Sequence, residues 1–146
     1  MPNYWLFKSE AETWSWDQQV ARGAEGESWN GVRNYQARNH MRAMKKGELG
    51  FFYHSGSERR VVGLVRVLNE VHPDPDDDTG TWDCVDLIAI APLPQPMTLE
   101  RIKTEPALAE MVLVKNSRLS VQPVTESEWK TVCKLGGLDP SKPSTP

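Results

Sequence analysis

The chain has little of the material from which metal sites and disulfide frameworks are built. Its 146 residues include two cysteines and three histidines. Cys84 and Cys133 lie far apart with no CxxC spacing, and the histidines are not at metal-ligand spacing either. This scarcity argues against a zinc site and a disulfide framework, and it fits a reducing compartment. We therefore expect no metal and no other cofactor.

Long apolar runs are missing as well. No stretch reaches the roughly 18 consecutive apolar residues of a membrane-spanning helix, so no membrane span is predicted. The segment from Met1 to Phe7 lacks the basic residues and the apolar run of a secretory signal. The expected location is the cytoplasm.

Positive charge is scarce overall but unevenly distributed. The formal net charge is −3, whereas proteins that clamp long duplex DNA by its phosphates are usually basic. Residues 28–47 nevertheless contain five basic residues and no acidic one, and residues 70–86 contain seven acidic residues and no basic one. Either the basic run faces phosphate locally, or both runs are simply solvated faces.

The length and the apolar patterning predict one folded domain over residues 1–136 and a flexible tail over 137–146. Strands are predicted over 4–7, 48–53, 61–71, 82–93 and 119–124, and helices over 13–20, 34–46, 98–103, 106–111 and 125–135. The prolines at 92, 94 and 96 are expected to end the fourth strand, and Pro123 places the last strand at an edge or a bulge. About five or six mostly antiparallel strands with helices between them indicate an α+β domain around a small, partly open barrel.

The segment from Trp29 to Asn39 carries the clearest functional signal. It places two aromatic residues, three Asn, one Gln and two Arg within eleven residues. Such a mixture makes a poor core, but it suits a surface that stacks on a flat ring and hydrogen-bonds its edges, as an unpaired base requires. A second stretch, residues 51–55, ends a predicted strand with Tyr53, His54 and Ser55, and we expect both stretches to share one pocket.

The aromatic residues have two possible roles each. Trp29 is the first candidate for a wall of the pocket, with burial in the core as its alternative. Tyr53 is either a second wall or a core tyrosine with its hydroxyl satisfied. The remaining tryptophans are expected to be structural, with Trp16 and Trp82 as the candidates for exceptions.

The polar candidates also have alternatives. Asn34 can simply cap a helix, whereas Asn30 is freer to donate to a ligand. Arg33 can pair with a phosphate or with Glu10, and His54 can donate to a base edge. The candidate nucleic-acid-binding residues are Lys8, Ser9, Trp29, Asn30, Arg33, Asn34, Tyr35, Arg38, Tyr53, His54, Ser55, Ser120 and Gln122.

Two of these expectations depend on periodicity. Ser120 and Gln122 alternate along one predicted strand, so both should point to the same side and complete the edge of the pocket. Arg38, Arg42 and Lys45 share one face of the predicted 34–46 helix and form a basic stripe that could contact the nucleic-acid backbone.

Four sequence blocks resemble those of the EVE domain family: residues 4–10 (YWLFKSE), 29–39, 51–55 (FFYHS) and 118–124 (RLSVQPV). They occur in the family's order, and the one visible departure is Ala11, where the family commonly has proline. The resemblance implies a PUA-like fold, a pseudo-barrel of strands with surrounding helices. It also implies kinship with domains that read modified bases, such as the YTH readers of methylated adenine, and no established catalytic role.

The favoured interpretation is a non-catalytic module that captures a modified base of DNA or RNA, such as methylated or hydroxymethylated cytosine or methylated adenine. It would act as a monomer, without a membrane partner and with an unidentified effector protein. One alternative is a hydrolase of modified nucleosides, because related ASCH domains use Lys and Glu and this chain offers Lys8, Ser9 and Glu10. Another is a small-molecule sensor that uses the same pocket. No Ser-His-Asp order, nucleophile elbow or metal motif is recognisable, so no catalytic residue is assigned.

Overall fold

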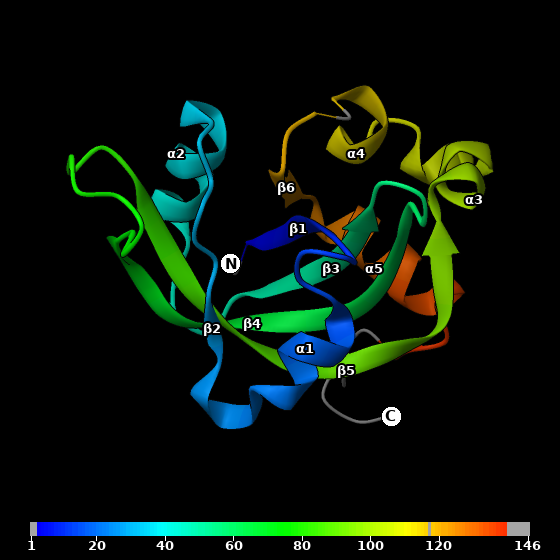
Figure 1. The fold of residues 1–146 in the computed structure, drawn as a ribbon. Coiled ribbons are helices and arrows are strands. Elements are labelled where there is room, and N and C mark those ends of the chain that lie inside the picture. Colours follow the sequence, from blue (N-terminus) through cyan, green and yellow to red (C-terminus); the bar gives the residue numbers. More distant parts are fainter. Residues whose placement is uncertain (1–2, 117, 140–146) are drawn as a thin grey trace.

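Figure 1 shows a computed structural model of the chain, which describes residues 3–116 and 118–139. Its centre is a six-stranded mixed sheet in the order β2-β5-β4-β3-β1-β6. The strands are β1 (Tyr4–Glu10), β2 (Glu27–Ser28), β3 (Leu49–Ser55), β4 (Arg60–Pro73), β5 (Asp83–Thr98) and β6 (Val121–Val124). The helices are α1 (Trp16–Ala21), α2 (Tyr35–Ala43), α3 (Leu99–Thr104), α4 (Val112–Lys115) and α5 (Glu126–Leu135), with short 3-10 turns η1 (Gly23–Glu25) and η2 (Pro106–Leu108). The predicted α+β class is confirmed.

The single parallel pair in the described sheet, β1 with β3, decides where the site lies. Phe7 pairs with Phe52 and Glu10 with Ser55, so the two strands run in the same direction. The carboxyl ends of β1 and β3 therefore lie side by side at the same end of the sheet. All other strand pairs are antiparallel.

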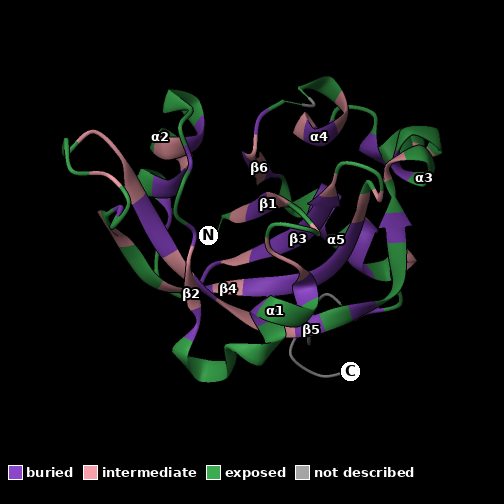
Figure 2. Ribbon diagram, viewed as in Figure 1, coloured by how far each residue is buried: buried purple, intermediate pink, exposed green. Residues whose placement is uncertain are grey.

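The sheet is buried on both faces, which gives two core clusters. Phe7 and Phe52 belong to one cluster, together with residues of α2. Leu6 and Phe51 belong to the other, together with Trp129 of α5. Successive strand residues point to opposite faces, so neighbours in sequence enter different clusters. Figure 2 shows the resulting band of buried residues along β3 and β4.

The expectation that the prolines end the fourth predicted strand is wrong. β5 continues to Thr98, and its last residues still pair with β4 through Met97 opposite Val61. β2 pairs with β5 only near Asp86, so this half of β5 is an edge with no strand on its other side. Residues 93–96 have no partner in β4, because they bulge between the pairs Pro92–Gly63 and Met97–Val61, so the prolines at 94 and 96 cost no ladder hydrogen bond.

Helix α2 is shorter than predicted, and this changes the basic stripe. It ends at Ala43, and Met44 already has an extended conformation. The buried carboxylate of Glu48 holds the next turn, because it accepts from the Lys45 N–H group at 2.9 Å and from the Trp5 indole at 2.9 Å. Lys45 therefore lies outside the helix, and the three-residue stripe does not form.

Several local predictions are confirmed. Asn34 caps α2 by accepting from the Ala37 N–H group at 2.9 Å. Thr125 and Glu128 form the capping box of α5. Pro123 lies in β6, which is an edge strand.

Described residues beyond α5 also pack against the core. Leu138, within the predicted tail, is buried in the second core cluster. Residues 140–146, the rest of that predicted tail, lie outside the described residues. Among the described residues, no helix is both long and apolar enough to cross a membrane.

Candidate functional site

A cavity of about 580 Å³ lies where the carboxyl ends of β1 and β3 meet. It is walled by the end of β1 and the turn after it, by β2 and the segment after it, and by the segment before β6. The lining residues are Lys8, Ser9, Glu10, Thr13, Trp14, Glu27, Ser28, Trp29, Asn30, Gly31, Val32, Arg33, Ser55, Arg118 and Ser120. Seven of the thirteen predicted residues are among them: Lys8, Ser9, Trp29, Asn30, Arg33, Ser55 and Ser120.

Trp29 has both of its predicted roles at once. Its ring packs edge-on against Phe7 and Phe52, with centroids 5.5 Å away in each case, and only 7% of the residue is exposed. Its N–H group donates to the Val85 carbonyl at 2.8 Å, which anchors the segment to β5. Trp29 also lines the cavity. The same ring therefore belongs to the core and forms a rigid part of the wall.

Trp14 is a second aromatic residue that lines the cavity. From the sequence it was expected to have only a structural role. The turn after β1 brings it back toward the sheet, because the Glu10 carbonyl accepts from the N–H groups of Thr13 and Trp14, both at 3.0 Å. Its indole donates to Gln19 at 2.9 Å, and the buried Gln19 amide donates to the Leu87 carbonyl at 3.0 Å. Its position four residues after the YWLFKSE block was the available signal.

The remaining wall of the cavity is polar and carries charge of both signs. Lys8 and Glu10 come from β1, and the Lys8 N–H group donates to the Ser120 carbonyl at 2.9 Å. Burial lowers the pKa of the Lys8 ammonium. Arg118 adds a second cation beside Ser120. Glu10, named from the sequence for the hydrolase alternative, lines the cavity too, and sequence reasoning missed Thr13, Glu27, Ser28, Gly31, Val32 and Arg118 as lining residues.

One buried carboxylate shapes the rim of the cavity. The Asp74 side chain accepts from the Gly31 N–H group at 2.8 Å, from the Arg33 guanidinium at 3.0 Å and from the Asp76 N–H group at 2.7 Å. Burial alone would raise the pKa of Asp74, but these hydrogen bonds and the Arg33 charge outweigh it and lower the pKa. Asn30 is held in the same way, since its amide donates to Asp76 at 2.7 Å.

The two charge runs of the sequence therefore meet, an arrangement that neither alternative foresaw. Arg33 pairs with Asp74, and Arg42 pairs with Asp83 at 2.7 Å. The Lys46 N–H group donates to Glu70 at 3.2 Å. Acidic side chains within residues 70–86 thus neutralise Arg33 and Arg42 inside the molecule, which leaves fewer cations for phosphate.

Three predicted pocket residues lie elsewhere, and their assignment to the pocket lining is wrong. Tyr53 is 2% exposed and belongs to the second core cluster. His54 accepts from the Trp16 N–H group through Nε2 at 3.0 Å, so its proton lies on Nδ1 and faces Glu58 at 2.9 Å. Gln122 is fully buried and donates to the Leu119 carbonyl at 2.7 Å. Because β6 begins only at Val121, the alternation assumed from Ser120 to Gln122 does not hold.

The other three predicted residues lie at the start of α2, outside the cavity. Asn34 caps the helix. Tyr35 stacks on Trp82 with centroids 4.9 Å apart, and Arg38 donates to the Thr81 carbonyl at 2.9 Å. Arg33 links this group to the cavity, because it lines the cavity and its guanidinium lies 5.6 Å from the Trp82 ring centroid. Within residues 3–116 and 118–139, no group of three His, Cys, Asp or Glu is placed to hold a metal ion.

β2 is tied to the sheet through Asp86, and this contact predicts a pH dependence of stability. Asp86 accepts from the Ser28 hydroxyl at 2.6 Å and pairs with His72 at 2.8 Å. The hydrogen bond with Asp86 raises the pKa of His72 above its ordinary value of 6.5. The stabilisation of the folded state by the His72–Asp86 pair is therefore complete below pH 6.5 and is lost as the pH rises through the folded-state pKa of His72.

We expect this partly exposed pair to contribute about 0.5 kcal/mol. Urea unfolding of the wild type and of His72→Gln across this pH window measures it. The difference in unfolding free energy between the two proteins should shrink toward high pH. A difference that stays constant would show that the ion pair contributes nothing.

Comparisons with known proteins identify a matching family and solved structures with the same fold. The sequence profile of the EVE domain matches residues 3–135. A solved protein from Agrobacterium tumefaciens is 53% identical with a TM-score of 0.91, over 99% of this chain and 96% of that one. Human thymocyte nuclear protein 1, solved in complex with DNA containing 5-methylcytosine, is 32% identical with a TM-score of 0.85, over 94% of this chain and 99% of that one.

A more distant likeness concerns the fold alone. A YTH domain from Zygosaccharomyces rouxii, solved with N6-methyladenosine RNA, is 14% identical with a TM-score of 0.58, over 94% of this chain and 88% of that one. The six-stranded mixed sheet and its surrounding helices thus have the predicted PUA-like fold. With the match of 3–135 to its profile, the chain belongs to the EVE domain family.

Proposed function

We propose that this chain is a non-catalytic nucleic-acid-binding module that takes one modified base into the cavity at the ends of β1 and β3. The observation that carries the proposal is the cavity itself, which combines indole rings with hydroxyl, amide and charged groups. Its volume of about 580 Å³ is within the roughly 300–1,000 Å³ typical of small-ligand pockets. The human relative solved with methylated DNA suggests a methylated base as the first ligand to test.

The lining groups match what recognition of a base requires. Stacking on an aromatic ring is worth about 1–3 kcal/mol per base, and Trp29 and Trp14 offer such rings. The carboxylate of Glu10 can accept from the exocyclic amine of cytosine or adenine, whereas Lys8 and Arg118 can only donate. A base that lacks the matching edge leaves these groups unpaired, which penalises it.

Discrimination of a single methyl group depends on how tightly the cavity closes around it. Burial of one methyl group is worth about 0.8 kcal/mol, which is only a few-fold preference. A close-fitting pocket can raise this to roughly 1–3 kcal/mol. We therefore expect a modest preference for the modified base over the unmodified one.

Titration with short single-stranded oligonucleotides tests the proposal. The set contains 5-methylcytosine, 5-hydroxymethylcytosine, N6-methyladenine or no modification, in both DNA and RNA. Arg33 is already paired with Asp74, so Lys8 and Arg118 limit the phosphate contacts at the cavity to about two, and the slope of log K against log salt concentration should be about −1.4 for a single strand. Equal affinity for modified and unmodified strands would contradict a reader, and binding of free nucleosides alone would point to a small-molecule sensor.

A second candidate function rests on the same wall. Lys8, Ser9 and Glu10 all line the cavity, and burial lowers the pKa of Lys8, as is often found for catalytic lysines. A hydrolase would convert modified nucleosides to products detectable by mass spectrometry, and Lys8→Met would abolish the conversion. Saturable binding without turnover supports the non-catalytic module proposed above. For that module we further expect a monomeric state, a cytoplasmic location and a separate effector protein.

A further inference from the structure

An exposed aromatic stack lies next to the cavity. Tyr35 is 61% exposed, and among the described residues Val20 is the other large hydrophobic side chain with such exposure. The Tyr35 ring stacks on Trp82 with centroids 4.9 Å apart and planes 30° apart. Two guanidinium groups approach the stack, those of Arg38 and Arg33. The core does not use the outward side of Tyr35.

The outer face of the Tyr35 ring is open to a ligand. The Arg38 guanidinium carbon lies 4.8 Å from the Tyr35 centroid and 5.7 Å from the Trp82 centroid. With the 4.9 Å between the two rings, these distances form a nearly equilateral triangle. Arg38 therefore lies beside the stack, since a group beyond the far face of Tyr35 would be much farther from Trp82.

The Trp82 end of the stack is built into a rigid turn. The Trp82 N–H group donates to the Asp77 carboxylate at 2.9 Å, and its carbonyl accepts from the Asp74 N–H group at 3.0 Å. Arg38 donates to the neighbouring Thr81 carbonyl at 2.9 Å, which ties α2 to this turn. Because both elements are held, the stack is already ordered before any ligand binds.

We propose that the outer face of Tyr35 stacks on the base next to the captured one in the same single strand, an inference that rests on the function proposed above. Every base has a flat face, so this contact is indifferent to sequence and adds affinity without choosing the base. Arg38 supplies a positive charge at the edge of the stacked base. Arg33 belongs to both places, since it lines the cavity and approaches Trp82.

A comparison of two ligands tests the platform. The first is 5-methyl-2′-deoxycytidine monophosphate, which can occupy the cavity alone. The second is a short single-stranded oligonucleotide with one central 5-methylcytosine. Tyr35→Ala should weaken binding of the oligonucleotide about 5- to 150-fold, the range of one base–aromatic contact, and leave binding of the mononucleotide unchanged. Tyr35→Phe keeps the ring and should bind as the wild type does.

Two controls sharpen the result. Val20→Ala shortens the other exposed apolar side chain, which does not line the cavity, and should change neither affinity. An oligonucleotide with abasic sites flanking the 5-methylcytosine should bind wild type and Tyr35→Ala equally, because the base that Tyr35 contacts is gone. Circular dichroism checks that the variants remain folded.

The outcomes separate the platform from the pocket. The platform is overturned if Tyr35→Ala loses affinity for both ligands equally, or if it keeps its affinity for the oligonucleotide. Neither result contradicts binding of the modified base in the cavity. Tyr35-dependent binding of the oligonucleotide with no preference for the modified base would uphold the platform and overturn the reader. Failure of the wild type to bind the oligonucleotide overturns both.

Discussion

Trp29→Ala should weaken binding of the modified base about 5- to 150-fold and also destabilise the protein. The ring is shared between the core and the cavity wall, so its removal leaves a void against Phe7 and Phe52. Truncation of a buried tryptophan costs about 3–5 kcal/mol, and loss of one stacking contact costs about 1–3 kcal/mol of binding. Urea unfolding and oligonucleotide titration measure the two effects. From the sequence alone we would expect such a variant to keep its stability, and burial of the ring argues against that.

A second core variant separates the two effects. Phe52 is fully buried, contacts Trp29 and does not line the cavity. Phe52→Leu should therefore lose about 1–2 kcal/mol of stability and keep its affinity for the base. Both variants are titrated at a temperature where each is folded by circular dichroism. Wild-type affinity in folded Trp29→Ala would remove Trp29 from the binding site.

Asp74→Ala should remove the hydrogen bonds that hold the rim of the cavity. Its carboxylate is fully buried and accepts from Gly31, Arg33 and Asp76, so the variant leaves three donors without their acceptor. We expect a loss of about 2–4 kcal/mol of stability and a weaker affinity for the base, because the Gly31–Arg33 segment is no longer held. Chemical unfolding and the same oligonucleotide titration provide the measurements.

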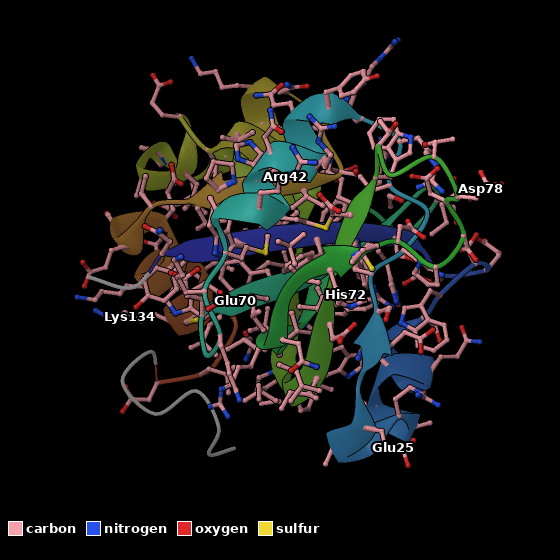
Figure 3. All side chains as sticks on the ribbon, turned by 90° about the vertical axis from the view of Figure 1, so that its left-hand side faces the viewer. Glu25, Arg42, Glu70, His72, Asp78 and Lys134 are labelled. Atoms are coloured by element: carbon pink, nitrogen blue, oxygen red, sulfur yellow. The ribbon has the colours of Figure 1, made fainter. Side chains whose placement is uncertain are left out.

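The acid dependence of Asp74 and a charge-matched variant complete this test. The pKa of Asp74 is lowered below its ordinary value of 3.8, so its stabilisation is present above pH 3.8 and is lost as the pH falls through the folded-state pKa. The difference between wild type and Asp74→Ala should shrink in that range. Asp78, which Figure 3 shows at the outer side of the same loop, is exposed, and Asp78→Ala removes equal charge with little effect. If both variants behave alike, net charge is the cause rather than the buried contacts.

The sequence alone was sufficient where the physical cause is local. Asn34 caps α2 and Thr125 forms the capping box of α5, because each side chain accepts from the N–H group three residues away. The apolar strands, the edge position of Pro123 and the family also followed from short stretches of chain. The mixture of rings and amides in residues 29–39 indicated a binding surface, and five of its residues line the cavity: Trp29, Asn30, Gly31, Val32 and Arg33.

Only the tertiary structure decided which side chains share the cavity and which cations are already paired. Gly31 and Asp74, which form the rim, are 43 residues apart, and Arg42 and Asp83 are 41 residues apart. Tyr53 and Ser55 are close in sequence, yet Tyr53 lies in the core and Ser55 lines the cavity, because Ser55 is the last residue of β3 and lies at the end of the strand where the cavity opens. Local patterns show that a residue is polar or aromatic, whereas its partner depends on how distant strands pair, and that pairing is set by packing of the whole chain.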